Sequence, residues 1–353
     1  MGSISAANAE FCFDVFKELR VHHANDNIFY CPLSMMAALA MVYLGARGNT
    51  EYQMEKVLHF DKIAGLGSIQ TKCGKSVNIH FLFKEILSDI TAPKANYSLH
   101  IANRLYAEKT SAILPIYVKC VKKLYRAGLE MVNFKTASNQ ARQRINSWVK
   151  NQTNGRIQDL LEPGSVDLHT VLVLVNAIYF KGIWKSAFNE EETREVPFSV
   201  TKVGGTDTAS DQGDRLLACT NSGLGDVKTT FSCRRPSDLR KMETQLFFKG
   251  KKLEDQTVSF KGLVHLTDQR KTFPSANLSG ISSAESLKIS EAVHEAYMEV
   301  TEEGTEVTGS TVVTGDTQAS SEFEEFRADH PFLFLIKHNP SNMILFFGRY
   351  CSP

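Results

Sequence analysis

The chain has 353 residues, of which 42% are hydrophobic and 22% are charged, and its formal net charge is +1. This is the composition of an ordinary globular chain, long enough for one large core or for two domains. Because the charge is nearly balanced, there is no reason to expect nucleic acid as a partner. No internal repeat, low-complexity tract or proline-rich hinge divides the sequence.

In the first half of the chain, predicted helices alternate with predicted strands. The predicted helices are at residues 33–44, 115–129 and 138–151, and the predicted strands are at residues 99–108 and 171–179. The helix at 115–129 is amphipathic, with Ile116, Cys120 and Leu124 on its apolar face. The near-continuous apolar run at 171–179 is typical of a strand that is buried on both faces.

Residues 203–271 differ in composition from the rest of the chain. They are rich in Gly, Ser, Thr and Asp, and no sustained amphipathic period runs through them. This composition and the lack of a period therefore predict little regular structure in residues 203–271.

Residues 301–321 follow a strand-like run and open with an acidic turn at Glu302 and Glu303. About twenty small, polar and β-branched residues come next, and a dense apolar pattern resumes at Phe326. Val and Thr favour extended structure, whereas linkers are usually rich in Gly, Ser and Pro. We interpret this segment as an exposed loop, tethered at both ends and able to form a strand.

The motifs of common enzyme and metal sites are missing. There is no GxSxG elbow, P-loop, GxGxxG or CxxC pair. His294-Glu295 begins like a zinc-binding HExxH, but Met298 occupies the position of the second histidine. We therefore expect no enzyme activity, no cofactor and no metal.

Several segments resemble the serpins, the serine protease inhibitor family. FRADHPFLFLI at 326–336 and MILFFGRY at 343–350 are similar to the C-terminal signature of that family, and NAIYFKG at 176–182 to a strand of its central sheet. Residues 27–60 are similar to helix B of the family and its entry. NLSGISSAESLKIS at 277–290, with the first nineteen residues, narrows the resemblance to the ovalbumin-related branch, close to avian egg-white proteins. The resemblance covers residues 1–201 and 273–353.

The resemblance implies an α+β serpin fold in one domain, 1–353, with helices around a large central sheet, two smaller sheets and a reactive-centre loop at 302–323. In serpins the interval 203–271 supplies a central strand, most of a small sheet and two short helices. Because no motif is found there, we expect the fold to be incomplete. One possibility is that the interval forms replacement structure. The other is that it is a divergent segment, either disordered or derived from an aberrant transcript, and this is the interpretation we favour.

The activity implied by the resemblance is serine protease inhibition, in which the cleaved loop inserts as a strand into the central sheet. Family spacing assigns the hinge to Glu303, Gly304, Thr305 and Val307 and the scissile bond to Gln318-Ala319. Thr305 suits insertion, but Val307 is bulkier than the alanine usual in inhibitors. We expect inhibition to be weak or lost. The alternative is a non-inhibitory egg-white storage protein or a binder of heparin-like polyanions.

Two further sets of residues follow from the resemblance. Ser34, Asn176 and His294 match the polar cluster beneath the point where the central sheet opens. Cys73 and Cys120 occupy the positions of the one disulfide of ovalbumin-like proteins.

A basic helical face follows from spacing alone. Lys119, Lys122, Lys123 and Arg126 are spaced i, i+3, i+4 and i+7 and share one side of a helix. Such a face could bind sulfates of a polyanion. The alternative, which we favour, is an ordinary solvated face.

Secretion is expected, although the first fifteen residues have no cleavable apolar core. Residues 28–46 lack formal charges and are long enough to span a membrane, but the resemblance makes them a buried helix and an uncleaved internal signal. Sequons at Asn96, Asn151 and Asn277 agree with secretion. We expect no stable membrane association.

Overall fold

In the computed structural model, the described residues are 3–63, 73, 77–93, 97–182, 227–232, 258–265, 276–283, 287–300 and 331–351. For 227–232, 258–265 and 299–300 the description is limited to the backbone.

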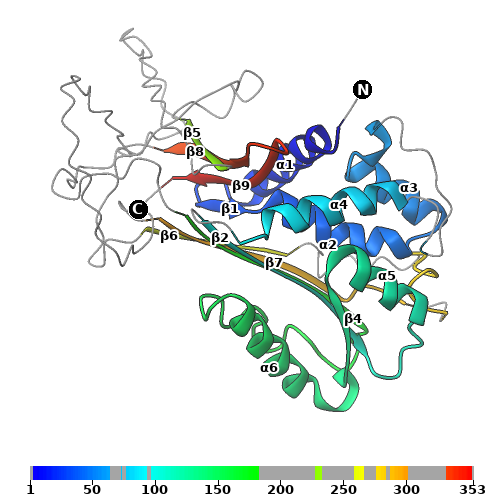
Figure 1. The fold of residues 1–353 in the computed structure, drawn as a ribbon. Helices are drawn as coiled ribbons and strands as arrows, with labels where there is room; N and C mark the ends of the chain where they lie inside the picture. Colours follow the sequence, from blue (N-terminus) through cyan, green and yellow to red (C-terminus); the bar gives the residue numbers. More distant parts are fainter. Residues whose placement is uncertain are drawn as a thin grey trace, which may run out of the picture.

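A five-stranded sheet forms the centre of the molecule, with the strand order β3-β2-β4-β7-β6 (Figure 1). Its strands are β2 (Tyr97–Glu108), β3 (Gly128–Val132), β4 (Leu172–Gly182), β6 (Val258–His265) and β7 (Glu291–Val300). β4 is antiparallel to β2 but parallel to β7. Residues 172–180 of β4 are all buried, as expected for an apolar strand with both faces covered.

A second sheet has the order β1-β9-β8-β5, with every neighbouring pair antiparallel. Its strands are β1 (Ile28–Tyr30), β5 (Val227–Ser232), β8 (Phe332–His338) and β9 (Met343–Tyr350). A tight turn joins β8 to β9, with Asn342 at a positive φ of 56°. A Cβ at Gly348 would collide with the ring of Phe334, so only glycine lets the two strands pack here.

The helices lie on both faces of the central sheet. They are α1 (Ile4–His22), α2 (Pro32–Gly45), α3 (Gly48–Val57), α4 (Val77–Ile90), α5 (Pro115–Tyr125) and α6 (Phe134–Gln152), with a short 3₁₀ helix η1 (Phe60–Lys62). In Figure 1, α1 to α5 lie on one side of the sheet and α6 lies across the other. α2 is buried along almost its whole length, in the main apolar core.

Most predicted elements are present, but one helix end was wrong. α5 ends at Tyr125 rather than 129, because Arg126 adopts a left-handed φ of 52° and the chain turns into β3. α6 contains a kink at Ala137, whose φ of −145° and ψ of 43° are not helical, so the helix expected from 138 is preceded by a short first turn. Asn133 caps that turn, because its side chain accepts a hydrogen bond from the Thr136 N–H at 3.2 Å.

The interval 203–271 contributes to both sheets, contrary to the expectation of an incomplete fold. β6 pairs with β7 from Val258↔Val300 to His265↔Val293 and forms an edge of the central sheet. β5 pairs with β8 over six residues. The strand thought to be missing from the central sheet is therefore present. The rest of the interval lies outside the described residues.

Candidate functional site

The site expected beneath the opening of the central sheet lies at the parallel junction of β4 and β7. Asn176 of β4 is the register partner of His294 on β7 and of Asn103 on β2. The three side chains therefore follow one row across the sheet. Ser34, from the first turn of α2, completes the group.

Asn176 is the centre of the hydrogen-bond network. Its Oδ1 accepts from the Ser34 hydroxyl at 3.0 Å and contacts the His294 Nδ1, and its Nδ2 donates to Asn103 Oδ1. The Cys31 N–H donates to the other ring nitrogen of His294, Nε2, at 3.0 Å. A nitrogen that accepts carries no proton, so His294 is a neutral ring protonated at Nδ1.

The network is uncharged because it is sealed from water. Ser34, Asn176 and His294 all have 0% exposure. Burial lowers the pKa of His294 from 6.5 to about 3, because the charged ring would lose its hydration without gaining an anionic partner. The cluster thus ties β4, β7 and α2 together at neutral pH without any ion pair.

Two members of the cluster were not predicted as such. Asn103 had no signal beyond its place in an alternating strand. Cys31 takes part through its main-chain N–H, and its Sγ accepts the Ser34 N–H at 3.2 Å and caps α2. Burial raises the pKa of the Cys31 thiol to about 12.

The chemistry of the cluster suits a mechanical role. The parallel junction has nine residue pairs, from Val173↔Glu291 to Lys181↔Glu299, and the row at Asn176↔His294 crosses it. Separating β4 from β7 would break the Asn176–His294 contact. Among the described residues, no group of His, Cys, Asp or Glu is arranged to hold a metal ion.

The reactive-centre loop is expected in the stretch of sequence that follows β7. β7 ends at Val300, and the chain next enters a described strand at β8, in the other sheet. The expected hinge and scissile residues lie outside the described residues: Glu303, Gly304, Thr305, Val307, Gln318 and Ala319.

A disulfide joins Cys73 to Cys120 of α5, across 47 positions of sequence. Cys12 and Cys31 are buried free thiols, and Cys351 is a half-buried one.

The four residues of the expected basic face are all exposed to solvent, but only Lys119, Lys122 and Lys123 lie on α5, because the helix ends before Arg126. Arg126 also donates to the Ser88 Oγ of α4 at 2.9 Å, which ties the face to the neighbouring helix. Ile116 does not join the apolar side of α5 as expected, because its side chain is 43% exposed.

Two of the three sequons lie within the described residues. Asn151 on the last turn of α6 and Asn277 are both exposed, whereas Asn96 lies outside the described residues. Across the described part of the chain, no helix has both the length and the apolar character needed to cross a membrane.

Comparisons with known proteins agree with the fold. A family model described as "Serpin (serine protease inhibitor)" matches residues 6–209 and 233–353. Ovalbumin-related protein Y of Gallus gallus is 50% identical over 388 aligned residues, and ovalbumin of Gallus gallus is 48% identical over 390. Each alignment covers 100% of both chains.

Two solved structures also match over 100% of both chains. Uncleaved ovalbumin is 44% identical with a TM-score of 0.75, and a cleaved, loop-inserted ovalbumin mutant is 43% identical with a TM-score of 0.78.

The family model also matches residues 233–271. Of the interval 203–271, which was expected to depart from the family, only residues 210–232 lie outside the match.

Proposed function

Because this chain belongs to the serpin family, we propose that residues 302–323 are a protease-sensitive loop whose cleavage inhibits the protease weakly or not at all. The observation that carries the proposal is the direct parallel pairing of β4 with β7. A chain that turns back after the end of β7 would run antiparallel to both strands if it entered between them. The junction is thus the place where a cleaved loop would insert.

Insertion at this junction has a definite cost. The nine residue pairs between β4 and β7 must separate, and the contact of His294 with Asn176 must break. Two new ladders, one on each side of the inserted strand, would offset this cost. The outcome therefore depends on how well the loop side chains fit between the strands.

The hinge sequence makes the fit poor. Val307 and Thr308 are β-branched, and Gly309 has a large conformational entropy to lose on ordering. Because β6 pairs with β7, the strand on one side of the junction has a hydrogen-bonded neighbour in the sheet. Hinge composition, rather than a missing strand, is then the reason to expect slow insertion.

A related chain supports the idea that this framework can accept a strand. The ovalbumin mutant that is 43% identical to this chain was solved cleaved and with its loop inserted. In the present chain Thr305 is small enough for insertion, so the β-branched pair that follows it is the expected obstacle.

The test is a gel assay for a complex that survives SDS after mixing with elastase-like, chymotrypsin-like and trypsin-like proteases. We expect cleavage between Thr305 and Ser321 without a stable complex, and little rise in Tm after nicking. The double variant Val307→Ala/Thr308→Ala should increase both the complex and the rise in Tm. Ser321→Ala, beyond the expected scissile bond, is the matched control and should change neither. A stable complex with the unaltered chain in substantial yield would contradict the proposal.

A second candidate function is polyanion binding by the basic side of α5. Three exposed lysines of α5 and the exposed Arg126 that follows them can attract sulfates, and their attraction is screened over about 8 Å at physiological ionic strength. Replacing Lys119, Lys122, Lys123 and Arg126 with Ala should abolish retention on heparin. The control replaces four exposed cations elsewhere, Arg20, Lys109, Lys135 and Lys150. Equal retention by both variants would leave this side of α5 as an ordinary solvated surface.

Secretion and glycosylation complete the proposal. Exposed sequons at Asn151 and Asn277 support passage through a secretory compartment, as does the Cys73–Cys120 disulfide. Expression in a secretory cell line, followed by glycosidase treatment of the medium, tests both points. Protein that stays inside the cell without glycans would contradict them.

A further inference from the structure

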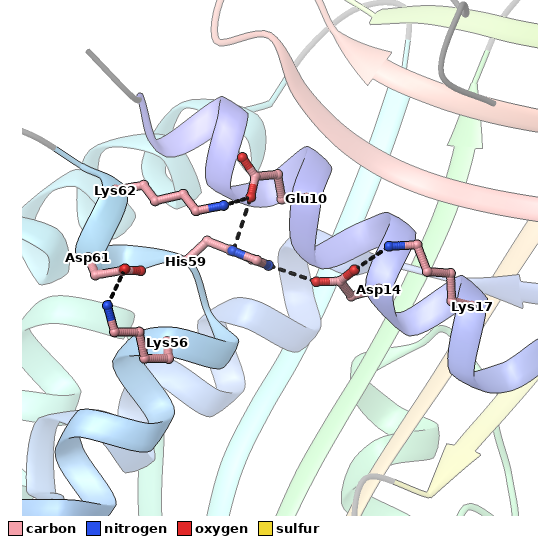
Figure 2. A network of polar contacts seen from close by, with 7 residues as sticks. All are labelled: Glu10, Asp14, Lys17, Lys56, His59, Asp61 and Lys62. Carbon is pink, nitrogen blue, oxygen red and sulfur yellow. Dashed lines mark hydrogen bonds and ion pairs between the residues drawn. The ribbon is translucent and has the colours of Figure 1, made fainter.

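His59 lies between two carboxylates of a neighbouring helix (Figure 2). Its Nδ1 is 3.1 Å from Glu10 Oε2, and its Nε2 is 2.9 Å from Asp14 Oδ2. Glu10 and Asp14 are one turn apart on α1, so they point to the same side of that helix. The His59 side chain is only 14% exposed.

The contact with Asp14 is a hydrogen bond and the contact with Glu10 is an ion pair, and the ring attracts both carboxylates only when it carries two protons. Ionised carboxylates accept hydrogen bonds and do not donate, and a neutral imidazole has one N–H. A neutral His59 would therefore donate to one carboxylate and turn a lone pair toward the other. Glu10 and Asp14 would also repel each other without a cation between them.

The surrounding charges complete an alternating row. Lys17 pairs with Asp14 at 2.7 Å, and Lys62 of η1 pairs with Glu10. Although partial burial acts to raise the pKa of Asp14, hydrogen bonds and charges from Lys17 and His59 lower it overall, so this carboxyl is ionised. The row thus runs Lys17, Asp14, His59, Glu10, Lys62.

A second ion pair lies beside the row without joining it. Lys56 of α3 pairs with Asp61 of η1 at 2.6 Å, and Figure 2 shows no contact drawn between this pair and the ring of His59. The groups that contact the ring directly are therefore the two carboxylates of α1.

His59 occupies a backbone position that fixes its direction. It adopts a left-handed conformation, φ 55° and ψ 27°, between the end of α3 and η1. The next residue, Phe60, is buried against the rings of Tyr43 and Phe83, at 5.4 and 5.9 Å. The turn is anchored in the core, and its imidazole reaches out to α1.

From this geometry we propose that His59 is a proton-controlled clasp between α1 and the turn that joins α3 to η1. The protonated ring holds both carboxylates, and the neutral ring releases one of them. Only the protonated, charged ring attracts both carboxylates, so the clasp holds α1 more firmly at acidic than at alkaline pH.

The test is amide hydrogen exchange of α1 and residues 58–62, with the variant His59→Asn compared with the unaltered chain at each pH. Asn tolerates the left-handed backbone and has no titrating ring. We expect protection to fall about fivefold at a pH of about 5.5, and less than twofold at about 8. The control His22→Asn removes a ring that faces a single carboxylate, Glu18, on its own helix, and should not change exchange at residues 58–62.

Equal losses of protection at the two pH values, or no loss at the lower one, would overturn the clasp. If His59→Asn does not fold, Asp14→Asn serves instead, because it keeps the ring and removes one of the two negative charges beside it. That variant should likewise lose protection mainly at the lower pH, and a loss independent of pH would overturn the clasp as well.

Discussion

His294 and His59 show how two regions of one chain use the same side chain in opposite ways. His294 has 0% exposure and contacts a main-chain N–H and an amide oxygen, neither of which carries a charge. His59 is near the surface and contacts two carboxylates. Burial among neutral partners favours the neutral ring, whereas paired anions favour the protonated ring. The partners of a histidine, together with its burial, therefore decide its charge.

The largest expected effect concerns the centre of the buried cluster. Asn176→Ala would remove a partner of Ser34, His294 and Asn103 at once, although the Ser34 hydroxyl can still donate to the Cys31 main-chain oxygen at 3.3 Å. Each buried polar group that loses its partner costs about 1–3 kcal/mol, so for His294 and Asn103 together we expect a loss of roughly 2–6 kcal/mol in the free energy of unfolding. Urea denaturation measures it. The control Asn25→Ala, at an exposed bend, should change stability by less than about 0.5 kcal/mol.

The next effect is acid sensitivity, which we expect from the buried histidines. Burial lowers the pKa of His294 to about 3 in the folded chain, so the unfolded chain takes up the proton first as pH falls. Its contribution is present above about pH 6.5 and is lost toward pH 3, at about 1.4 kcal/mol per pH unit. His80 is buried in the same way, with a pKa of about 3.

The variant His294→Gln tests this sign. Glutamine can accept from the Cys31 N–H and donate to Asn176, but it does not titrate. Between pH 7 and 5, the free energy of unfolding should fall less steeply in this variant than in the unaltered chain. The exposed control His22→Gln should leave the slope nearly unchanged. Identical slopes for His294→Gln and the unaltered chain would show that His294 is not a neutral, buried ring.

A smaller effect is expected at the cap of α2. The thiol of Cys31 is a weak acceptor for the Ser34 N–H, whereas serine is among the preferred capping residues. Cys31→Ser should raise the free energy of unfolding by up to about 1 kcal/mol. Cys12→Ser is the matched control, because it places a hydroxyl in the core without a helix to cap and should destabilise. A loss of stability in both variants would contradict the prediction.

The smallest effect belongs to the outer end of the charged row. The side chains of Lys62 and Glu10 are 52% and 44% exposed, and such pairs contribute about 0.2–1 kcal/mol. Lys62→Gln should lower stability within that range, and the difference should shrink in high salt. The exposed Lys84 of α4 provides the control, Lys84→Gln. A loss well above the range would mean that the row acts as one unit with His59.

Local patterns in the sequence predicted the elements whose burial is continuous. The apolar density of residues 33–44 and the run at 171–179 correspond to α2 and β4, because those elements are covered on every side. Helix ends were less predictable. The left-handed turn at Arg126 depends on where the chain must turn next, and the short turn before the kink at Ala137 depends on the Asn133 cap; the helix period reveals neither.

Long-range pairing was beyond local reasoning. β6 has no strong period of its own, and its place is defined by eight residue pairs with β7. Composition alone therefore suggested that a strand was missing. Asn103 likewise reads as one polar residue in a strand, and only the register of β2 against β4 brings it to Asn176.

The sequence by itself determined the family, the α+β class and the residue types of the buried cluster, because motifs and apolar runs are local features that can be recognised in the sequence alone. Tertiary structure decided which side chains meet. Ser34, Asn176 and His294 are brought together by one helix and two strands. His59 meets Glu10 and Asp14 because a turn anchored by Phe60 packs beside α1. The protonation of a histidine side chain follows from such contacts, because it depends on burial and on the charge of the partners rather than on position in the chain.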